Sequence, residues 1–502
     1  MSIDVAMRER VQQAYSPELL RELAHSLSAK LATHFETIER GEGPVLNWNL
    51  PETNLEKART VLSENDGSRG ATVSELQRRF DDLVQLALSR GHNLHHPSYI
   101  GHQVPASVPI AGLFDALGAI TNQVMAVYEM GPWATAVERA LIDGWGETIG
   151  FEQDRFGGLI THGGSLANLT GLLTARNVML GDVWERGLAL RPKPPVLVAH
   201  ADAHYGIARS AGILGIGTEN IVRVGLDDRR RMDPQQLDEE LSQLRRANVP
   251  IIAVSSCACA TPIGAFDPLN DIADICAKHE VWLHVDAAHG GAVSFSRRHR
   301  HLIAGLERAE SAICDAHKML FVPALCAFVF YRDASHRFET FRQDAPYLFD
   351  PSSPGLAQID SGLVTVECTK RAAAFGLWGL WSMFGVGLFE DLIDVTFATA
   401  RRLYEKLVEA PDFEPLHEPE CNIVAFRFQP REMPLTVDQI GELNRTVRRR
   451  LIESGRFYIV QTTLNGTGAL RVSVMNPLTN ESHLDGLLDA IRQLAKEIIE
   501  KS

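Results

Sequence analysis

The feature that most restricts the fold of this chain is a repeated alternation, starting near residue 91, of short apolar runs and amphipathic stretches. Each apolar run is rich in β-branched residues and ends in a loop of small residues. The runs are GGLITHGG, PPVLVAHADAHYG, VPIIAVSSCACATP, VWLHVDAAHGG and LCAFVFYRD. Strands that alternate with helices in this way are typical of a mostly parallel sheet with helices on both faces. We therefore predict a large α/β domain.

Changes of pattern along the chain predict three regions. Residues 1–90 read as polar helices, broken by the sequence GEGPVLNWNLPE. Residues 91–375 contain the alternation described above. Residues 376–502 read as a smaller α+β domain, with short strands such as NIVAFRF and ALRVSVM. At the start of this last region, residues 374–395 read as one long apolar helical stretch.

Charge and cysteine content narrow the expected partners and compartment. The 502 residues include 49 Lys and Arg against 63 Asp and Glu, which gives a formal net charge of −14. Such a surface repels nucleic acid and anionic membranes, so neither is an expected partner. No stretch is long and apolar enough to span a bilayer, and the first residues do not resemble a signal peptide. Seven cysteines without CxxC spacing indicate reduced thiols, and we expect a cytoplasmic protein.

The sequence HVDAAHGGA, residues 284–292, places the carboxylate of Asp286 at the end of a run that reads as a buried strand. In open α/β sheets, ligands bind beyond the carboxyl ends of the strands. The loops THGG (161–164) and HADAH (200–204) also follow strands, so the three loops can converge on one pocket. Opposite charges about 4 Å apart gain roughly 4 kcal/mol at an effective dielectric of 20. Asp286 would therefore keep a bound pyridine nitrogen protonated.

The sequence THGGSLANLTG opens a helix after a glycine turn. The free backbone N–H groups at a helix start favour an anion such as a phosphate, and Ser165 would add a hydroxyl donor. An ordinary serine cap after a glycine turn explains the same pattern. The glycines of GILGIG (212–217) follow a helix and are better explained as its C-terminal turn.

Lys318 lies in DAHKML, ahead of a second apolar run. Burial lowers the pKa of a lysine and favours a Schiff base with an aldehyde. The alternative is a lysine that extends along the surface and keeps its charge in water. A phosphate loop, an aspartate at a strand end and a lysine 32 residues later together predict pyridoxal phosphate (PLP) as the cofactor.

This ordered set resembles the PLP-dependent group II amino-acid decarboxylases, the family of the glutamate, cysteine sulfinate, diaminobutyrate and aromatic amino-acid decarboxylases. The likeness covers about residues 90–485 and rests above all on HVDAAHGG and DAHKML. GGSLAN, DAHYGIARSAGILG, ALRVSVMNP and HPSYIGH support it. The resemblance implies a carboxy-lyase of the aspartate-aminotransferase type (fold type I), with a seven-stranded sheet in the large domain. It also implies a homodimer, in which residues 1–90 pack on the partner.

The resemblance implies which residues form the site. The expected catalytic residues are Lys318, which would bind the cofactor aldehyde, His204, which would stack on the ring, and Asp286. The other expected cofactor contacts are Gly164, Ser165, Ala288 and His317, of which Ala288 leaves room beneath the ring and the rest hold the phosphate. The expected substrate contacts are Arg471, which would hold a carboxylate, and Tyr99, His102 and Gln103. No metal site is expected.

Three positions depart from the family pattern. Ala260 stands where a threonine beside the cofactor is usual, and His289 replaces an aromatic residue. The loop 347–371 resembles the glutamate and cysteine sulfinate branch, in which a loop tyrosine returns a proton after carbon dioxide leaves. Counting from Tyr347-Leu348-Phe349, the corresponding residue is Gly355, and no tyrosine occurs between Phe349 and Arg402.

The leading interpretation is decarboxylation of an L-amino acid, with acidic ones favoured by the branch, to the corresponding amine. His204, His289, Lys318 or water would then supply the proton. The alternative, suggested by the missing tyrosine, is decarboxylation-dependent oxidative deamination or transamination, which gives an aldehyde. A serine hydrolase is disfavoured because the chain lacks the G-x-S-x-G sequence. A metal site at HADAH is disfavoured because a strand end does not bring its two histidines onto one helix face.

Overall fold

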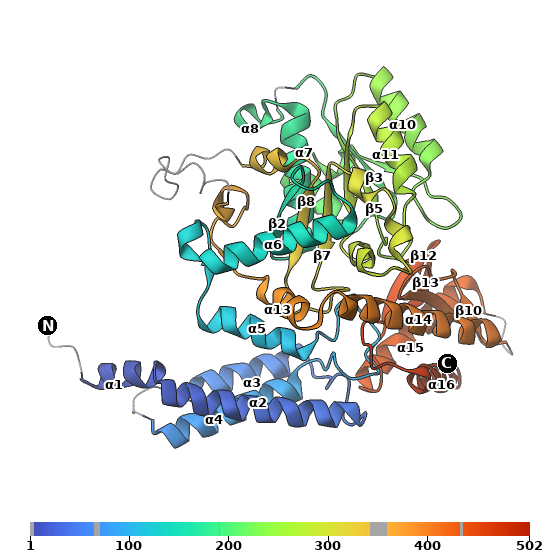
Figure 1. Ribbon diagram of the computed structural model, residues 1–502. Coiled ribbons are helices and arrows are strands. Elements are labelled where there is room, and N and C mark those ends of the chain that lie inside the picture. The colour runs from blue at the N-terminus through green and yellow to red at the C-terminus, as the bar shows by residue number, and fades with distance from the viewer. Residues whose placement is uncertain (1–4, 65–70, 190, 342–358, 432–434, 502) are drawn as a thin grey trace.

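The computed structural model describes residues 5–64, 71–189, 191–341, 359–431 and 435–501. Its largest sheet is built from β2 (Gly157–Thr161), β3 (Val196–His200), β4 (Ile221–Val224), β5 (Ile251–Cys257), β6 (Trp282–Asp286), β7 (Ser311–Asp315) and β8 (Ala327–Tyr331). Across the sheet the strands follow the order β2, β8, β7, β6, β5, β3, β4. Figure 1 labels β2, β8, β7, β5 and β3 among them. Strand β8 is antiparallel to both neighbours, and the other pairings are parallel. The expected mostly parallel seven-stranded sheet is confirmed.

The two faces of this sheet pack into separate apolar cores, because successive residues of a strand point to opposite sides. Along β6, Leu283 and Val285 belong to one apolar cluster and Trp282 to another. The first cluster includes residues of α6 (Pro132–Ile149), α10 (Pro234–Arg246) and α11 (Leu269–Lys278). The second includes residues of α7 (Gly164–Leu180), α8 (Val183–Arg186) and α9 (Tyr205–Ile213). Strand β6 is therefore buried along its whole length, as is typical of parallel sheets.

A smaller α+β unit with its own apolar core follows the large sheet. Its antiparallel sheet consists of β10 (Phe413–Pro415), β11 (Ile423–Phe428), β13 (Thr467–Ser473) and β12 (Val460–Leu464), in that spatial order. Its helices are α14 (Gly387–Glu409), α15 (Val437–Glu453) and α16 (Glu481–Ile499). Figure 1 shows this unit, in orange and red, beside the large domain. The expected domain boundaries near residues 90 and 375 stay predictions.

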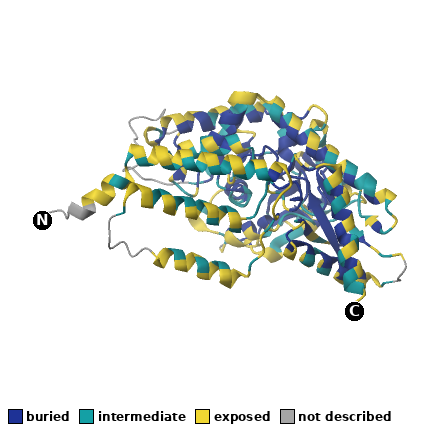
Figure 2. Ribbon diagram, turned by 90° about the horizontal axis from the view of Figure 1, so that it is seen from below, coloured by how far each residue is buried: buried dark blue, intermediate teal, exposed yellow. Residues whose placement is uncertain are grey.

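Four helices precede the large domain: α1 (Val5–Ala14), α2 (Pro17–Glu39), α3 (Pro51–Ser63) and α4 (Val73–Arg90). The side chain of Ser16 caps the start of α2, and Thr72 forms a capping box with Glu75 at the start of α4. Helices α2 and α4 pack on each other. Figure 2 shows that much of this N-terminal region is exposed. Large apolar side chains also remain exposed here, namely Leu20, Leu50, Leu55, Leu62 and Leu83.

The sequence 374–395, expected as one helical stretch, contains two helices. Helix α13 (Phe375–Phe384) packs against α5 (Pro109–Ile120) and stops at Gly385. The φ of 68° at Gly385 lies in the left-handed region, which glycine adopts readily at the end of a helix. Helix α14 then begins at Gly387. The GILGIG sequence, by contrast, forms the turn after α9 that was predicted.

The segment 359–371 is attached to the large domain by hydrogen bonds, an ion pair and a short strand pairing. The carboxylate of Asp360 accepts a hydrogen bond of 2.8 Å from the backbone N–H of Tyr128. Lys370, in β9 (Lys370–Arg371), forms a buried ion pair of 2.7 Å with Glu138. Strand β9 pairs with β1 (Val124–Met125). Gly355 and the sequence Tyr347-Leu348-Phe349 lie outside the described residues.

Three further features bear on the expectations from composition. Among the helices of the described ranges, none combines the length and the apolar character that crossing a membrane requires. In the same part of the chain, no group of three or more His, Cys, Asp or Glu side chains is arranged to hold a metal ion. All seven cysteines are free thiols, and six of them are buried.

Candidate active site

A cavity of about 510 Å³ lies where β5, β6 and β7 end. Ten of the eleven residues predicted for the site line it, and Tyr99 is the exception. The ten come from four strand ends or helix starts of the large domain, from the 102–103 segment and from β13. The sequence motifs therefore converge in space, as the loops at the carboxyl ends of parallel strands are expected to do.

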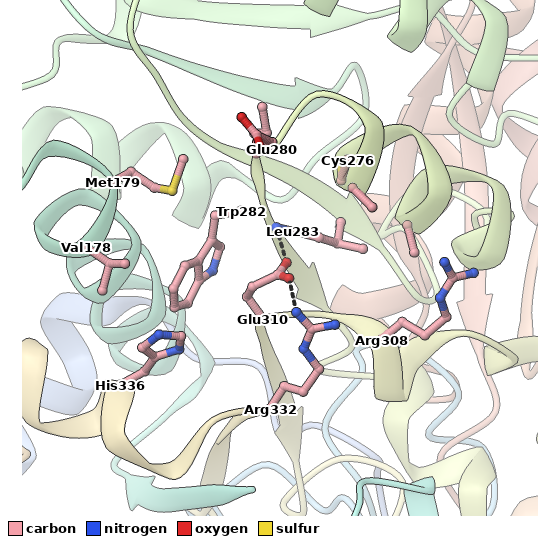
Figure 3. Close-up of a pocket in the computed structure, with 13 residues that line it drawn as sticks. Val178, Met179, Cys276, Glu280, Trp282, Leu283, Arg308, Glu310, Arg332 and His336 are labelled. Carbon is pink, nitrogen blue, oxygen red and sulfur yellow. Dashed lines mark hydrogen bonds and ion pairs between the residues drawn. The ribbon is translucent and has the colours of Figure 1, made fainter. Parts of the chain in front are cut away.

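A second hollow, of about 360 Å³, lies at the opposite end of β6, where the strand begins with Trp282 (Figure 3). There the carboxylate of Glu310 accepts a hydrogen bond of 2.7 Å from the backbone N–H of Leu283 and pairs with Arg332 at 2.5 Å. The negative charge of Glu310 is therefore already balanced by Arg332. None of the predicted site residues lines this hollow.

The start of α7 forms one end of the active-site cavity. Its first turn follows Gly163, whose φ of 113° suits glycine, and no side chain caps the helix. Ser165 lies inside the helix, so the alternative of an ordinary serine cap does not hold. A Cβ on Gly164 would lie 2.7 Å from Oδ2 of Asp315, which leaves no space for a side chain. The backbone N–H groups of this turn are therefore available to an anion such as a phosphate.

Lys318 lies in the cavity beside a buried carboxylate. Its Nζ is 3.2 Å from Oδ2 of Asp315, the last residue of β7, and its side chain is 23% exposed. Oδ1 of Asp315 is buried without a hydrogen-bond partner in the described part of the chain. His317 is buried next to Lys318, with Nδ1 2.9 Å from the carbonyl oxygen of Cys326. The ammonium group therefore points into the cavity and not along the surface.

Asp286 ends β6 with both carboxylate oxygens hydrogen bonded. Oδ2 accepts from the side-chain amide of Asn168 at 2.9 Å, and Oδ1 accepts from the backbone N–H of Ala288 at 3.1 Å. Both donors are neutral, and the ion pairs of the described residues do not include Asp286. A cationic ring nitrogen would be the matching partner for this charge. The small Ala288 also lines the cavity.

His204 caps α9 at another side of the cavity. Its Nδ1 accepts a hydrogen bond of 3.1 Å from the backbone N–H of Gly206. Burial lowers the pKa of His204, while the nearby Asp286 opposes that shift. The ring is therefore neutral at pH 7, and its proton lies on Nε2, because Nδ1 is the acceptor.

Arg471 reaches the cavity from β13 of the smaller sheet. It is 7% exposed, and its Nη2 donates a hydrogen bond of 3.0 Å to Oε1 of Gln103. Nε is buried without a partner, and no carboxylate pairs with this guanidinium in the described ranges. Burial also lowers the pKa of Arg471. A desolvated cation without an anion favours a carboxylate ligand.

Tyr99 lies behind this wall of the cavity. It is fully buried, stacks on Tyr458 with ring centroids 5.7 Å apart, and donates a hydrogen bond of 3.0 Å to the carbonyl oxygen of Val104. It thereby supports the segment that carries His102 and Gln103, both of which line the cavity. The predicted contact of Tyr99 with substrate stays a prediction.

His289 lies in the cavity wall where the family usually has an aromatic residue. The amide of Asn422 donates 2.9 Å to the carbonyl of Val474, so its Oδ1 accepts from Nε2 of His289 at 2.8 Å. Nδ1 of His289 is buried without a partner. Burial lowers the pKa of His289 to about 3. At neutral pH its only proton is held by Asn422, which argues against His289 as a proton donor.

Asn168 and His162 are among the residues of the cavity wall that were not anticipated from the sequence. Asn168 was quoted only as part of GGSLAN, although its spacing of one turn from Gly164 puts it on the same side of α7. His162 was quoted only as part of THGG, where the glycines that follow it were the residues of interest. Its Nδ1 lies 2.6 Å from Oε1 of Glu367, and it lines the cavity. Glu367 belongs to the anchored segment 359–371, and no local pattern predicts that contact.

These observations fit PLP, the cofactor that the resemblance implies. The uncapped helix start would receive the phosphate, and the carboxylate of Asp286 would receive the protonated ring nitrogen. Lys318 would carry the aldehyde carbon, and the flat neutral ring of His204 would cover the cofactor. Ala260, the departure from the usual threonine, also lines the cavity and offers no side-chain hydrogen bond. The roles of the individual residues stay predictions.

Comparison with known proteins identifies the family. The chain matches the pyridoxal-dependent decarboxylase conserved domain over residues 73–429. It is 32% identical over 463 residues to the human acidic amino acid decarboxylase GADL1, covering 90% of this chain and 87% of that protein. It is 29% identical over 476 residues to rat cysteine sulfinic acid decarboxylase, covering 92% and 94%.

Solved structures agree. The crystal structure of mouse CSAD matches with a TM-score of 0.83 at 27% identity, covering 95% of this chain and 98% of that one. Oryza sativa TDC with PLP and tryptamine has the same fold, with a TM-score of 0.85 at 21% identity over 96% and 99%. Fold, motif residues and a family match over most of the chain lead to one conclusion: the chain belongs to the pyridoxal-dependent decarboxylase family and is a PLP-dependent amino-acid carboxy-lyase.

Proposed function

We propose that the protein decarboxylates an L-amino acid with an acidic side chain to the corresponding amine. The observation that carries the amino-acid substrate is Arg471, a buried guanidinium in the cavity whose partner Gln103 is neutral and which pairs with no carboxylate of the described residues, so that it can bind the α-carboxylate of a substrate. The similarity to proteins named acidic amino acid decarboxylase and cysteine sulfinic acid decarboxylase supports an acidic side chain. His102 and Gln103 are the proposed contacts of that side chain.

The proposed division of labour follows from the positions of the residues. When bound at Lys318, PLP supplies an electron sink that stabilises the charge left on Cα as carbon dioxide departs. Arg471 holds the α-carboxylate away from the water outside the cavity and fixes its direction. Asp286 keeps a proton on the ring nitrogen, because an ionised carboxylate without a cationic partner stabilises a positive charge. The N–H groups at the start of α7 hold the phosphate.

A proton must then reach Cα. His289 is a poor candidate, because its Nε2–H is bonded to Asn422 and burial lowers its pKa to about 3. His204 has a proton on Nε2, and Lys318 lies in the same cavity. We propose that one of these two residues, or water, replaces the phenol that the family branch carries in its loop.

A second candidate function has a specific observation in its favour. No tyrosine occurs between Phe349 and Arg402, and the counted position is Gly355. Without a phenol to return the proton to Cα, the chemistry that PLP would supply includes oxidation by dioxygen, which releases ammonia and peroxide, and transfer of the amino group to the cofactor. The product would then be an aldehyde, formed by oxidative deamination or by decarboxylation-dependent transamination.

We further infer a cytoplasmic homodimer. Exposed apolar side chains on α5 support a second subunit as partner, namely Leu113, Leu117 and Ile120. The exposed leucines of α1–α4 support the proposal that residues 1–90 pack on that subunit. The free thiols support a reducing compartment.

The test of the proposed function is a panel of L-amino acids, with products identified by mass spectrometry under air and under nitrogen. Amine from aspartate, glutamate or cysteine sulfinate in both atmospheres is the expected result. Aldehyde with ammonia and peroxide under air would support the second candidate. Turnover of only aromatic or basic amino acids would overturn the acidic substrate class.

A further inference from the structure

A continuous line of buried hydrogen bonds leads from the far end of β6 to the active-site carboxylate. Trp282 Nε1 donates to Ser311 Oγ at 2.8 Å, and Ser311 Oγ lies 2.8 Å from Nδ1 of His284. His284 Nε2 lies 2.8 Å from Oδ1 of Asn168, whose amide nitrogen donates to Oδ2 of Asp286 at 2.9 Å. We call these four residues, Trp282, Ser311, His284 and Asn168, the β6 chain.

Chemistry fixes the direction of every bond in the β6 chain. An ionised carboxylate only accepts, so Asn168 must donate to Asp286, and its oxygen must face His284. His284 therefore donates from Nε2, and in a neutral ring Nδ1 accepts from the hydroxyl of Ser311. The indole of Trp282 can only donate. All four bonds thus point toward Asp286, and bonds aligned in this way polarise one another.

The β6 chain follows from the two-residue alternation of side chains along a strand. Trp282, His284 and Asp286 alternate along β6, so their side chains lie on one face of the sheet. Ser311 starts the neighbouring strand β7 and pairs in register with His284. Helix α7 closes over this face at Gly171, where a Cβ would lie 2.7 Å from Cε1 of His284.

The β6 chain is buried and carries no charge up to Asp286. Trp282, His284, Ser311 and Asn168 are each at most 3% exposed. Burial lowers the pKa of His284 to about 4, so the ring stays neutral at physiological pH. None of these four side chains carries a positive charge at neutral pH, so none competes with the cationic partner of Asp286.

We propose that Trp282, Ser311, His284 and Asn168 are positioning residues, which hold the Asp286 carboxylate ionised and in fixed orientation for the ring nitrogen of PLP. The inference rests on the proposed role of Asp286 and is independent of which amino acid is the substrate. Trp282 is the outermost member. Its indole lies beside His336 in the hollow of Figure 3, with ring centroids 4.9 Å apart.

The test compares Ser311→Ala and Trp282→Phe with wild-type holoenzyme. Neither residue lines the active-site cavity. The first readout is the rate at which PLP leaves the resting enzyme on dilution. The second is the ¹⁵N chemical shift of the ring nitrogen in enzyme loaded with labelled PLP, which reports whether that nitrogen is protonated. We expect Ser311→Ala to release PLP about tenfold faster and to shift the nitrogen signal toward the unprotonated form.

The matched control is Thr174→Val. Thr174 is a buried hydroxyl on the same helix α7, bonded at 2.8 Å to Tyr331 and at 2.7 Å to Thr340, away from the β6 chain. Thr174→Val should lower the melting temperature by about as much as Ser311→Ala and Trp282→Phe do. It should leave the PLP release rate and the ¹⁵N shift within error of wild type. If Asn168→Leu folds, it should change the PLP release rate and the ¹⁵N shift more than the other variants do. If it does not fold, Ser311→Ala and Trp282→Phe still test the proposal.

The proposal would be overturned if Ser311→Ala and Trp282→Phe had the same PLP release rate and the same ¹⁵N shift as the control Thr174→Val. Asp286→Asn separates this failure from that of the proposed site. If Asp286→Asn leaves the ¹⁵N shift unchanged, the role of Asp286 itself is wrong. If only the β6-chain variants leave it unchanged, Asp286 acts without their help. Since both readouts use resting enzyme, a wrong substrate class would affect neither.

Discussion

Arg471 Nη2 donates a hydrogen bond of 3.0 Å to Oε1 of Gln103, a residue 368 positions earlier in the chain. Because Gln103 is neutral, it orients the guanidinium and leaves its positive charge to a ligand. We predict that Gln103→Glu, which has nearly the same shape, supplies an internal carboxylate that competes with substrate. The expected result is a KM at least tenfold higher for an acidic amino acid, measured by steady-state kinetics at neutral pH.

Gln103→Met is the control for this prediction, because it removes the acceptor without adding a charge. Its KM should rise less than that of Gln103→Glu, and both variants should bind PLP as wild type does. Equal KM values for Gln103→Glu and wild type would show that substrate does not use this guanidinium.

Lys318 is predicted to be the attachment point of the cofactor, because its Nζ lies in the cavity 3.2 Å from Asp315. The purified protein should be yellow, and borohydride should fix one pyridoxyl group per chain. Peptide mapping by mass spectrometry checks the position, with Lys278, which pairs with Asp238 on the surface, as an internal reference. A label on any lysine other than Lys318 would falsify the assignment.

Asp286→Asn should keep the fold and much of the bound PLP and lose most of the activity. The amide has nearly the size of the carboxylate but cannot pair with a cationic ring nitrogen. The lost interaction, roughly 4 kcal/mol for charges about 4 Å apart at an effective dielectric of 20, corresponds to about a thousandfold in kcat. Circular dichroism and PLP absorbance control for folding and loading. Turnover near that of wild type would contradict the electron-sink role.

Gly355→Tyr tests the missing phenol. If the loop position counted from the sequence is right, the variant should shift products from aldehyde toward amine. The measurement is the ratio of amine to aldehyde for wild type and variant, under air and under nitrogen. Stoichiometric amine from the wild type in both atmospheres would mean that another acid already does this work.

His417 gives a pH dependence with a definite sign. Its Nε2 accepts a hydrogen bond of 3.1 Å from the backbone N–H of Ala425, and burial lowers its pKa to about 4 from 6.5. Between these two values the unfolded chain binds a proton that the folded chain does not, so stability falls as the pH falls. The loss stops below about pH 4, where both states are protonated.

The variant His417→Gln keeps an acceptor for Ala425 and does not titrate. Urea unfolding of both proteins between pH 7 and pH 4 measures the difference. The free energy of unfolding of the wild type should fall relative to the variant by at most about 1.4 kcal/mol per pH unit. Parallel curves for the two proteins would show that His417 is protonated in the folded state or is not buried as described.

Much of this site was predictable because its chemistry is tied to local patterns. Asp286 ends a run that the apolar pattern predicts as a strand, and Lys318 was located by the DAHKML motif ahead of the next apolar run. The glycine turn before α7 is also readable, since Gly163 and Gly164 precede a helical period. The sheet itself followed from the alternation of strands and helices, although β4 (Ile221–Val224) and β7 (Ser311–Asp315) were not among the apolar runs recognised as strands.

What the sequence did not reveal are contacts between distant segments. His162 meets Glu367 across 205 positions and Asn168 meets Asp286 across 118, and periodicity carries no information about such pairs. The predicted single helical stretch 374–395 failed for a different reason. Its apolar character continues through Gly385, but one left-handed residue is enough to redirect the backbone, and hydrophobic spacing does not detect it.

The origin of Arg471 on β13 has an evolutionary consequence. The groups proposed to handle the cofactor are on the large sheet and its helices, whereas the guanidinium comes from a strand with a separate apolar core. Substitutions around β13 can therefore change how the guanidinium of Arg471 is placed, and with it the binding of the substrate carboxylate, while the proposed cofactor contacts keep their positions. Selection on the strength of substrate binding can act on one sheet while the other is held constant.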